Sequence, residues 1–207
     1  NDVPMTLIGR PTLPANNYAD LVKWLEANKG KINLANAGLG AASHLCGLLF
    51  QQSVKIDMTT VPYKGTGPAM TDLLGGQVDI MCDQTTNTTQ QIESGKVKAY
   101  AVTTLKPLTT PALAKLPTLH ASRLKGFNVS IWHALYAPKG TSKAVQDKVN
   151  AALRVALKDP EFIKRQEGLG AVVVTDGRMN PAEHKKFVAS EIDKWGAVIK
   201  AAGQYAD

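Results

Sequence analysis

The sequence has few of the residues and patterns that mark common functional sites. Its 207 residues include two cysteines and four histidines, and none of them lies at the spacing of metal ligands. No apolar run approaches 18 residues, so no transmembrane helix is predicted. There is no Gly-x-Ser-x-Gly elbow, P-loop or Gly-x-Gly-x-x-Gly fingerprint. We therefore expect no metal, no cofactor and no catalytic residue.

An enzyme would have to rely on one set of polar residues, Ser43, His44 and Asp83. Ser43 and His44 are neighbours on a predicted helix, so their side chains diverge. A nucleophile and its base must lie within hydrogen-bond reach. We therefore expect a protein that is not an enzyme.

The two cysteines, Cys46 and Cys82, each lie among apolar residues. We interpret both as small buried side chains, with a disulfide between them as the less favoured alternative, and on this interpretation they do not indicate a cellular compartment. The chain begins at Asn1 without a signal peptide, and we expect any export signal to have been removed.

The formal net charge of +7 is uneven, because +6 of it falls after residue 107. A basic balance suits an anionic small molecule, an acidic partner surface or nucleic acid. The basic residues are scattered among acidic ones along helical patterns, and no zinc-finger or ribonucleoprotein signature occurs. We interpret the excess as solvated helix faces and expect no nucleic-acid partner.

Short apolar runs alternate with amphipathic stretches over the first half, which is typical of an α/β sheet. We predict one βα lobe over residues 7–107, with the Gly38–Gly40 loop as its ligand loop. The predicted strands are 5–8, 32–36, 58–61, 78–82 and 97–103, and the predicted helices are 18–25, 42–52, 68–74, 86–93.

The second half, residues 108–207, has a different pattern. Proline and glycine interrupt residues 105–126 too often for a regular element, and we interpret this stretch as a crossover between lobes. After it we predict strands 129–137 and 171–174, helices 142–157 and from 160 onward, and a last helix after Asn180 with an apolar stripe of Phe187, Ile192, Trp195 and Ile199.

The most informative segment joins the second predicted strand to the next helix. Two glycines allow a tight turn, and free N–H groups at a helix start bind carboxylates or phosphates. The spacing is equally compatible with an ordinary strand-to-helix turn. If the segment binds an anion, the candidate ligand residues are Ala37, Gly38, Leu39, Gly40, Ala41, Ala42 and Ser43.

Other loops follow strands of the same predicted sheet, and such loops gather at one edge, where ligands bind. Tyr63 and Lys64 offer a ring and a cation, or else form a surface turn. Asp83 ends an apolar strand before the polar stretch 84–89. It would accept a ligand hydroxyl or amine, or cap the next helix; the many polar groups favour a ligand role.

Several segments in order along the chain resemble one family, the Bug extracytoplasmic solute receptors of tripartite tricarboxylate transporters. The similarity covers nearly the whole chain. The segments that carry it are Ile32–Gly40 with His44 and Leu45, Val61–Gly65, Asp72–Asp79 with Met81 and Asp83, Gly95–Val97, Ala101–Thr103, Leu116–Thr118, Trp132, Ala137–Thr141 and Lys194–Trp195.

The resemblance implies a periplasmic-binding-protein-like (type II) fold of two α/β lobes with a cleft between them. It also implies a periplasmic receptor that captures a small organic anion, a mono- or dicarboxylate, and delivers it to a membrane permease. In such receptors the loop at Gly38–Ser43 holds a carboxylate through backbone N–H groups, hydroxyls and water.

The chain departs from the family pattern in two ways. Members carry about a hundred more residues ahead of this point, roughly the size of a small domain. We therefore expect one nearly complete lobe, with residues 108–207 bracing an incomplete first lobe and associating with another copy through the helices after Ser142. In addition, Ala41 and Ala42 replace the usual hydroxyl residues. The alternative function is the effector-binding domain of a transcriptional regulator with the same fold.

Overall fold

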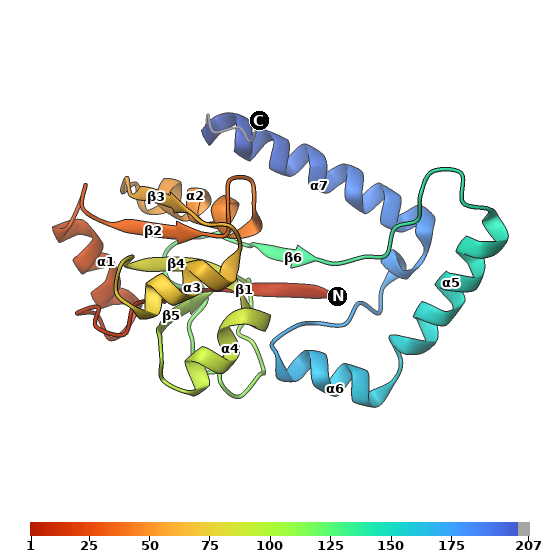
Figure 1. The fold of residues 1–207 in the computed structure, drawn as a ribbon, viewed down its shortest axis with the longest axis horizontal. Coiled ribbons are helices and arrows are strands. Elements are labelled where there is room, and N and C mark those ends of the chain that lie inside the picture. The colour runs from red at the N-terminus through yellow and green to blue at the C-terminus, as the bar shows by residue number, and fades with distance from the viewer. Residues whose placement is uncertain (203–207) are drawn as a thin grey trace.

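The structure, a computed structural model, describes residues 1–202. A mixed sheet and the helices around it occupy one side of the molecule (Figure 1). The strands are β1 (Asp2–Gly9), β2 (Asn33–Asn36), β3 (Thr59–Pro62), β4 (Ile80–Gln84), β5 (Lys98–Val102) and β6 (Ser130–Trp132). The helices are α1 (Tyr18–Ala27), α2 (Ala42–Val54), α3 (Thr66–Leu74), α4 (Thr85–Glu93), α5 (Lys143–Ala156), α6 (Pro160–Gly168) and α7 (Pro181–Ala202), with a 3-10 turn η1 (Gly177–Met179).

The strand order is β3-β2-β4-β1-β5, and β6 pairs with the first residues of β1. Strand β2 runs parallel to β3 and β4, whereas β1 runs antiparallel to β4 and β5. The carboxyl ends of β2, β3, β4 and β5 therefore meet at one edge of the sheet, together with the start of β1. This arrangement confirms the predicted α/β class and the predicted gathering of the strand-end loops.

Successive strand residues point to opposite faces of the sheet and pack into two separate hydrophobic cores, one on each face. Leu34 belongs to the core beneath α1 and α2, while its neighbour Ala35 belongs to the core beneath α3. Helix α2 approaches the sheet closely, because a Cβ on Gly47 would lie 2.9 Å from the Leu34 side chain. The sheet thus separates two layers of helices, and α2, α3 and α4 begin at the edge where β2, β3 and β4 end.

The stretch 105–126 contains no helix or strand, as predicted, but it folds back onto the sheet. Thr118 bridges to Val102 at the end of β5, and Leu119 and Phe127 join the core beneath α1 and α2. The division of the chain at residue 107 stays a prediction.

Helices α5 and α6 lie at the end of the molecule opposite the sheet, beyond β1 and β6 (Figure 1). Their predicted starts are confirmed, because Ser142 and Asp159 cap them through their side chains. The predicted strands around them are wrong. Residues 129–137 form only the three-residue β6, and residues 171–174 form a single bridge, Asp2–Val172. Within the described residues, Asp2 is the residue of β1 that pairs with this segment.

The last helix, α7, begins after Asn180, whose side-chain oxygen accepts from the N–H of Ala182. The predicted stripe is wrong at Ile192, which is 66% exposed. Phe187 and Trp195 do pack inward, against Trp132 and the core respectively. Eight residues separate them, so both face the molecule, whereas Ile192 is rotated away from that face.

The interpretation of Cys46 and Cys82 as unpaired residues is wrong, although both are buried. They form a disulfide between α2 and β4, with their Cα atoms 6.0 Å apart. Strand β4 lies beside β2 and directly under α2, and this contact joins residues 36 apart in sequence. Closing a loop of that length contributes about 4 kcal/mol to stability in the chain-entropy account.

Candidate functional site

The turn after β2 requires its glycines. Gly38 has φ 128° and Gly40 has φ 75°, both in the region that disfavours other residues. A Cβ on Gly38 would also lie 3.1 Å from the carbonyl oxygen of Tyr63. The loop is tied to the following strand, because the N–H of Tyr63 donates to the carbonyl of Asn36 at 3.0 Å.

Three buried side chains hold the loop from below. Gly38 N–H donates to Asn36 Oδ1 at 2.9 Å, and Ala37 N–H donates to Ser43 Oγ at 2.9 Å. Gly40 N–H donates to His44 Nδ1 at 3.1 Å. These three N–H groups of the predicted anion loop therefore serve the loop's own structure. Leu39, at its tip, is 54% exposed.

The donors that remain belong to the start of α2. Its N-cap, Ala41, makes no side-chain capping bond, and Ala41 N–H is used by the carbonyl of Gly38 at 3.1 Å. The first N–H groups of a helix have no acceptor within it. Those of Ala42 and Ser43 carry the positive end of the helix dipole and can donate to an anion. The Ser43 hydroxyl accepts from Ala37 and keeps its own proton to donate.

The helices that begin at this edge share an unusual feature. Helices α2, α3 and α4 follow β2, β3 and β4 directly, and none of the three has a side-chain cap. Helices elsewhere in the described chain are capped by a side-chain oxygen. The uncapped starts are Ala41, Gly65 and Gln84, and the capped ones are Asn17, Ser142, Asp159 and Asn180.

The start of α4 is covered by the later part of the chain. Thr85 is fully buried, and a Cβ on Gly170 would lie 2.9 Å from its Cβ. Thr89 donates to the carbonyl of Leu169 at 3.3 Å, and Thr88 bonds to Thr6 at 2.8 Å. The polar stretch 84–89 thus supplies mainly internal hydrogen bonds, which leaves the starts of α2 and α3 as the accessible ones.

Asp83 ends β4 and is 1% exposed. It lies between the starts of α3 and α4, where Asn87 Nδ2 donates to its carboxylate at 3.3 Å and Thr66 also bonds to it. Burial raises the pKa of this carboxyl above its usual range, although those hydrogen bonds favour the charged form. Met81, two residues earlier on β4, faces the core beneath α3, so Asp83 approaches the edge from the face opposite Ser43.

The structure places the side chains of Tyr63 and Lys64 in different surroundings. The Tyr63 hydroxyl donates to Asp72 Oδ2 on α3 at 2.7 Å, and desolvation together with this carboxylate raises its pKa to about 12. Its ring is therefore engaged with α3, and its backbone supports the Gly38 turn. Lys64 is exposed and belongs to none of the ion pairs within residues 1–202.

Sequence reasoning missed Asn36 and Thr66 at this edge. Asn36 is 1% exposed, and its Nδ2 has no hydrogen-bond partner. A polar residue that ends an apolar strand immediately before a glycine turn was the signal available for it. Thr66 follows the glycine at the start of α3 and had no comparable signal, because its contact with Asp83 depends on the sheet order.

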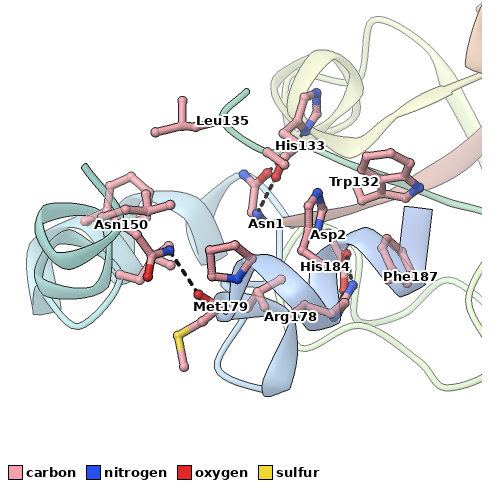
Figure 2. Close-up of a pocket in the computed structure, with 16 residues that line it drawn as sticks. Asn1, Asp2, Trp132, His133, Leu135, Asn150, Arg178, Met179, His184 and Phe187 are labelled. Carbon is pink, nitrogen blue, oxygen red and sulfur yellow. Dashed lines mark hydrogen bonds and ion pairs between the residues drawn. The ribbon is translucent and has the colours of Figure 1, made fainter. Parts of the chain in front are cut away.

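A hollow of about 280 Å³ lies away from this edge, between β1 and the helices α5, α6 and α7 (Figure 2). Trp132 and Phe187 meet edge to face there, with ring centroids 5.3 Å apart, and His184 packs beside both. The remaining lining is largely apolar and includes Leu153 and Phe162.

The cation in this hollow, Arg178, is already engaged. It donates to both oxygens of Asp2 at 2.9 and 2.7 Å and to Asp176, and it lies over the ring of Phe187. These carboxylates raise its pKa further. Figure 2 shows the pair at the start of β1. Arg178 thus fastens η1 to β1, and the hollow offers an apolar surface rather than an anion site.

Residues 1–202 include no site for a metal ion and no membrane-spanning helix. Within that range no group of three or more His, Cys, Asp or Glu side chains could hold a metal ion. None of the helices there combines the length and the apolar character needed to cross a membrane.

The chain is similar in sequence to a family of transporter receptors. The model of the tripartite tricarboxylate transporter family receptor (TctC) matches residues 1–204. A UPF0065 protein of Agrobacterium vitis, from the TAR-I ttuE-ttuC' intergenic region, is 45% identical over 98% of the chain. The chain spans 58% of that relative's length.

Two solved structures share the fold and extend beyond the chain. The periplasmic binding protein BugD is 51% identical with a TM-score of 0.91, over all of this chain and 68% of its own. MatC of Rhodopseudomonas palustris, solved with bound malate, is 35% identical with a TM-score of 0.86, over 96% of this chain and 67% of its own. The fold is therefore that of periplasmic binding proteins, with the two lobes present in part.

Proposed function

The chain belongs to the tripartite tricarboxylate transporter receptor family, and from this premise we propose that it binds a small organic carboxylate at the start of α2. The observation that carries the proposal is the uncapped N-terminus of α2, behind a glycine turn that buried side chains hold in place. The family consists of receptors rather than enzymes, and it does not support the alternative of a regulator's effector domain.

We propose the following recognition of the ligand. The N–H groups of Ala42 and Ser43, with the Ser43 hydroxyl, donate to one carboxylate. The rest of the loop from Ala37 to Ala41 shapes the seat, and Tyr63 supports it through its backbone. Lys64 contributes positive potential, since it is exposed and outside the described ion pairs. Alanine at residues 41 and 42 leaves the backbone as the main source of donors.

Asp83 would distinguish among carboxylates. As an acceptor at the same edge it suits a ligand that carries a hydroxyl or amine beside its carboxylate. Malate, the ligand in MatC, has such a hydroxyl. Malate is therefore the first probe, and succinate, which lacks only the hydroxyl, is its matched comparison.

The protein would act outside the cytoplasm and deliver its ligand to a membrane permease. The family description supports the partner, and the relative BugD is described as periplasmic. The Cys46–Cys82 disulfide supports an oxidising compartment independently of that likeness.

We propose that residues 7–107 carry this site and that residues 108–207 brace a first lobe that is incomplete in this chain. Helices α5 and α6 contain no buried residue. Of nine exposed large apolar side chains within residues 1–202, seven follow residue 107: Leu135, Tyr136, Val145, Val149, Val155, Val172 and Ile192.

Such a surface favours self-association of this chain through the helices after Ser142. Light scattering over a concentration series tests this. The Val149→Lys variant is expected to shift the chain toward monomer, whereas Gln90→Lys on α4 adds the same charge elsewhere and should not. A wild-type chain that stays monomeric at high concentration would contradict self-association.

Isothermal calorimetry with malate and succinate tests the binding proposal. We expect measurable binding of malate, weaker binding of succinate and no response to an uncharged diol of similar size. Binding that is unchanged in Ser43→Ala combined with Ala42→Pro would refute the location of the site, and the absence of heat for a wider panel of carboxylates would refute the function for this chain.

A further inference from the structure

The Cys46–Cys82 disulfide joins two elements that both lead into the proposed site. Cys46 lies on α2, one turn after Ala42 and Ser43, whose N–H groups are the proposed donors. Cys82 lies on β4 and immediately precedes Asp83, the proposed acceptor. The bond therefore connects the helix that carries the donors to the strand that carries the acceptor, a few residues from each.

The bond lies in the interior rather than at the surface. Cys46 is fully buried and Cys82 is 1% exposed. The adjacent Gly47 sits against Leu34 of β2, where a Cβ would be only 2.9 Å from that side chain. Helix α2 therefore rests on two neighbouring strands at this level, by close packing on β2 and by a covalent bond on β4.

The start of α2 needs such support because its own capping is weak. No side chain caps it, and the buried amide of Asn36 beneath the turn has an unpartnered Nδ2. Ligand groups must be held within about 0.5 Å of the productive geometry for full binding. A helix that can shift along the sheet would move the N–H groups of Ala42 and Ser43 relative to Asp83.

We propose that Cys46 and Cys82 are positioning residues of the anion site, and that their disulfide fixes the start of α2 relative to Asp83. This inference rests on the proposed function. It predicts that loss of the bond weakens ligand binding beyond what lost stability explains.

The test compares two variants of similar stability. Cys46→Ala with Cys82→Val removes the bond but keeps an apolar, strand-compatible interior. Leu25→Ala, at a fully buried position of α1, removes core contacts far from the site and so lowers stability. Malate affinity is measured by calorimetry at a temperature at which circular dichroism shows both variants folded. We expect the double variant to bind about tenfold more weakly, in line with the cost of small misplacements, and Leu25→Ala to bind as wild type.

Hydrogen exchange without ligand gives an independent readout. We expect faster exchange at the amides of residues 42–45 in the double variant, with little change at the distal end of α2. Wild-type affinity and exchange in the double variant would overturn the proposal, as would an equal loss of affinity in Leu25→Ala or free thiols in the native protein. If wild type binds no carboxylate, the proposed function fails, and the exchange measurement still decides whether the bond positions α2.

Discussion

Replacing Ala42 by proline should remove one ligand donor and leave the fold intact. Ala42 is the first residue of α2, where proline is well tolerated because its missing N–H has no acceptor within the helix. The preceding residue must be extended, and Ala41 already has φ −65° and ψ 157°. The substitution therefore deletes a single backbone N–H that points at the proposed anion.

The size of the effect follows from the bond removed. A hydrogen bond to a charged group contributes about 1.5–3 kcal/mol, which corresponds to a dissociation constant raised about 10- to 150-fold. Lys143→Pro is the matched control, since Lys143 is the first residue of α5 and its cap, Ser142, has φ −61° and ψ 149°. Its exposed ion pair with Asp147 contributes little.

Calorimetry with malate and thermal unfolding of both variants provide the assay. We expect Ala42→Pro to lose affinity while its melting temperature stays near that of Lys143→Pro. Equal malate affinity in wild type and Ala42→Pro would refute the assignment of the α2 start as the carboxylate seat. A large fall in the melting temperature of Ala42→Pro alone would refute the inference that proline fits this position.

Three further predictions concern stability. Burial raises the pKa of the Asp83 carboxyl in the folded state, so this group stabilises the fold below its unfolded-state pKa, and that stability is lost as pH rises. The melting temperature of Asp83→Asn minus that of wild type should therefore become more positive from pH 4 to 7. A difference that does not change with pH would contradict this. Gly170→Ala should cost about 2–4 kcal/mol in urea unfolding, because φ is +77° and the new Cβ meets Thr85; a neutral result would refute that crowding. Arg178→Met should cost about 1–3 kcal/mol by leaving Asp2 unpaired, and full stability in urea would show that the contact contributes nothing.

The first half of the fold was predictable because its signals are local. Strands and helices alternate with clear breakers, and Asn17 and Gly30 mark the limits of α1 as residue types alone suggest. The antiparallel direction of β1 was not predictable in this way. Its seven buried residues resemble a parallel central strand, and its direction is set by pairing with distant segments.

The disulfide and the predicted strand 171–174 both show that the sequence does not reveal long-range partners. In the first case a partner was missed, and in the second a partner was expected that the structure does not provide. The residues around Cys46 and Cys82 are apolar and give no sign of a partner for either cysteine. Only the pairing of β2 with β4 brings the two together. Residues 171–174 have strand-like composition, but within the described residues they form a single bridge, between Val172 and Asp2. Composition describes how well a segment would pair, and the rest of the chain decides whether a partner exists.

The candidate site was located from the sequence by its glycines, yet the structure points to a sharper signal in the residues that begin each helix. Asparagine, serine and aspartate begin the helices away from the proposed ligand edge and satisfy their N–H groups. Alanine, glycine and glutamine begin α2, α3 and α4, and none of them caps. Uncapped starts cost stability, and here they coincide with the carboxyl ends of parallel strands. Gly170 and Leu169 cover one of them, which leaves the starts of α2 and α3 for a ligand. A weak cap directly after a strand therefore carries information about binding that a glycine pattern alone does not.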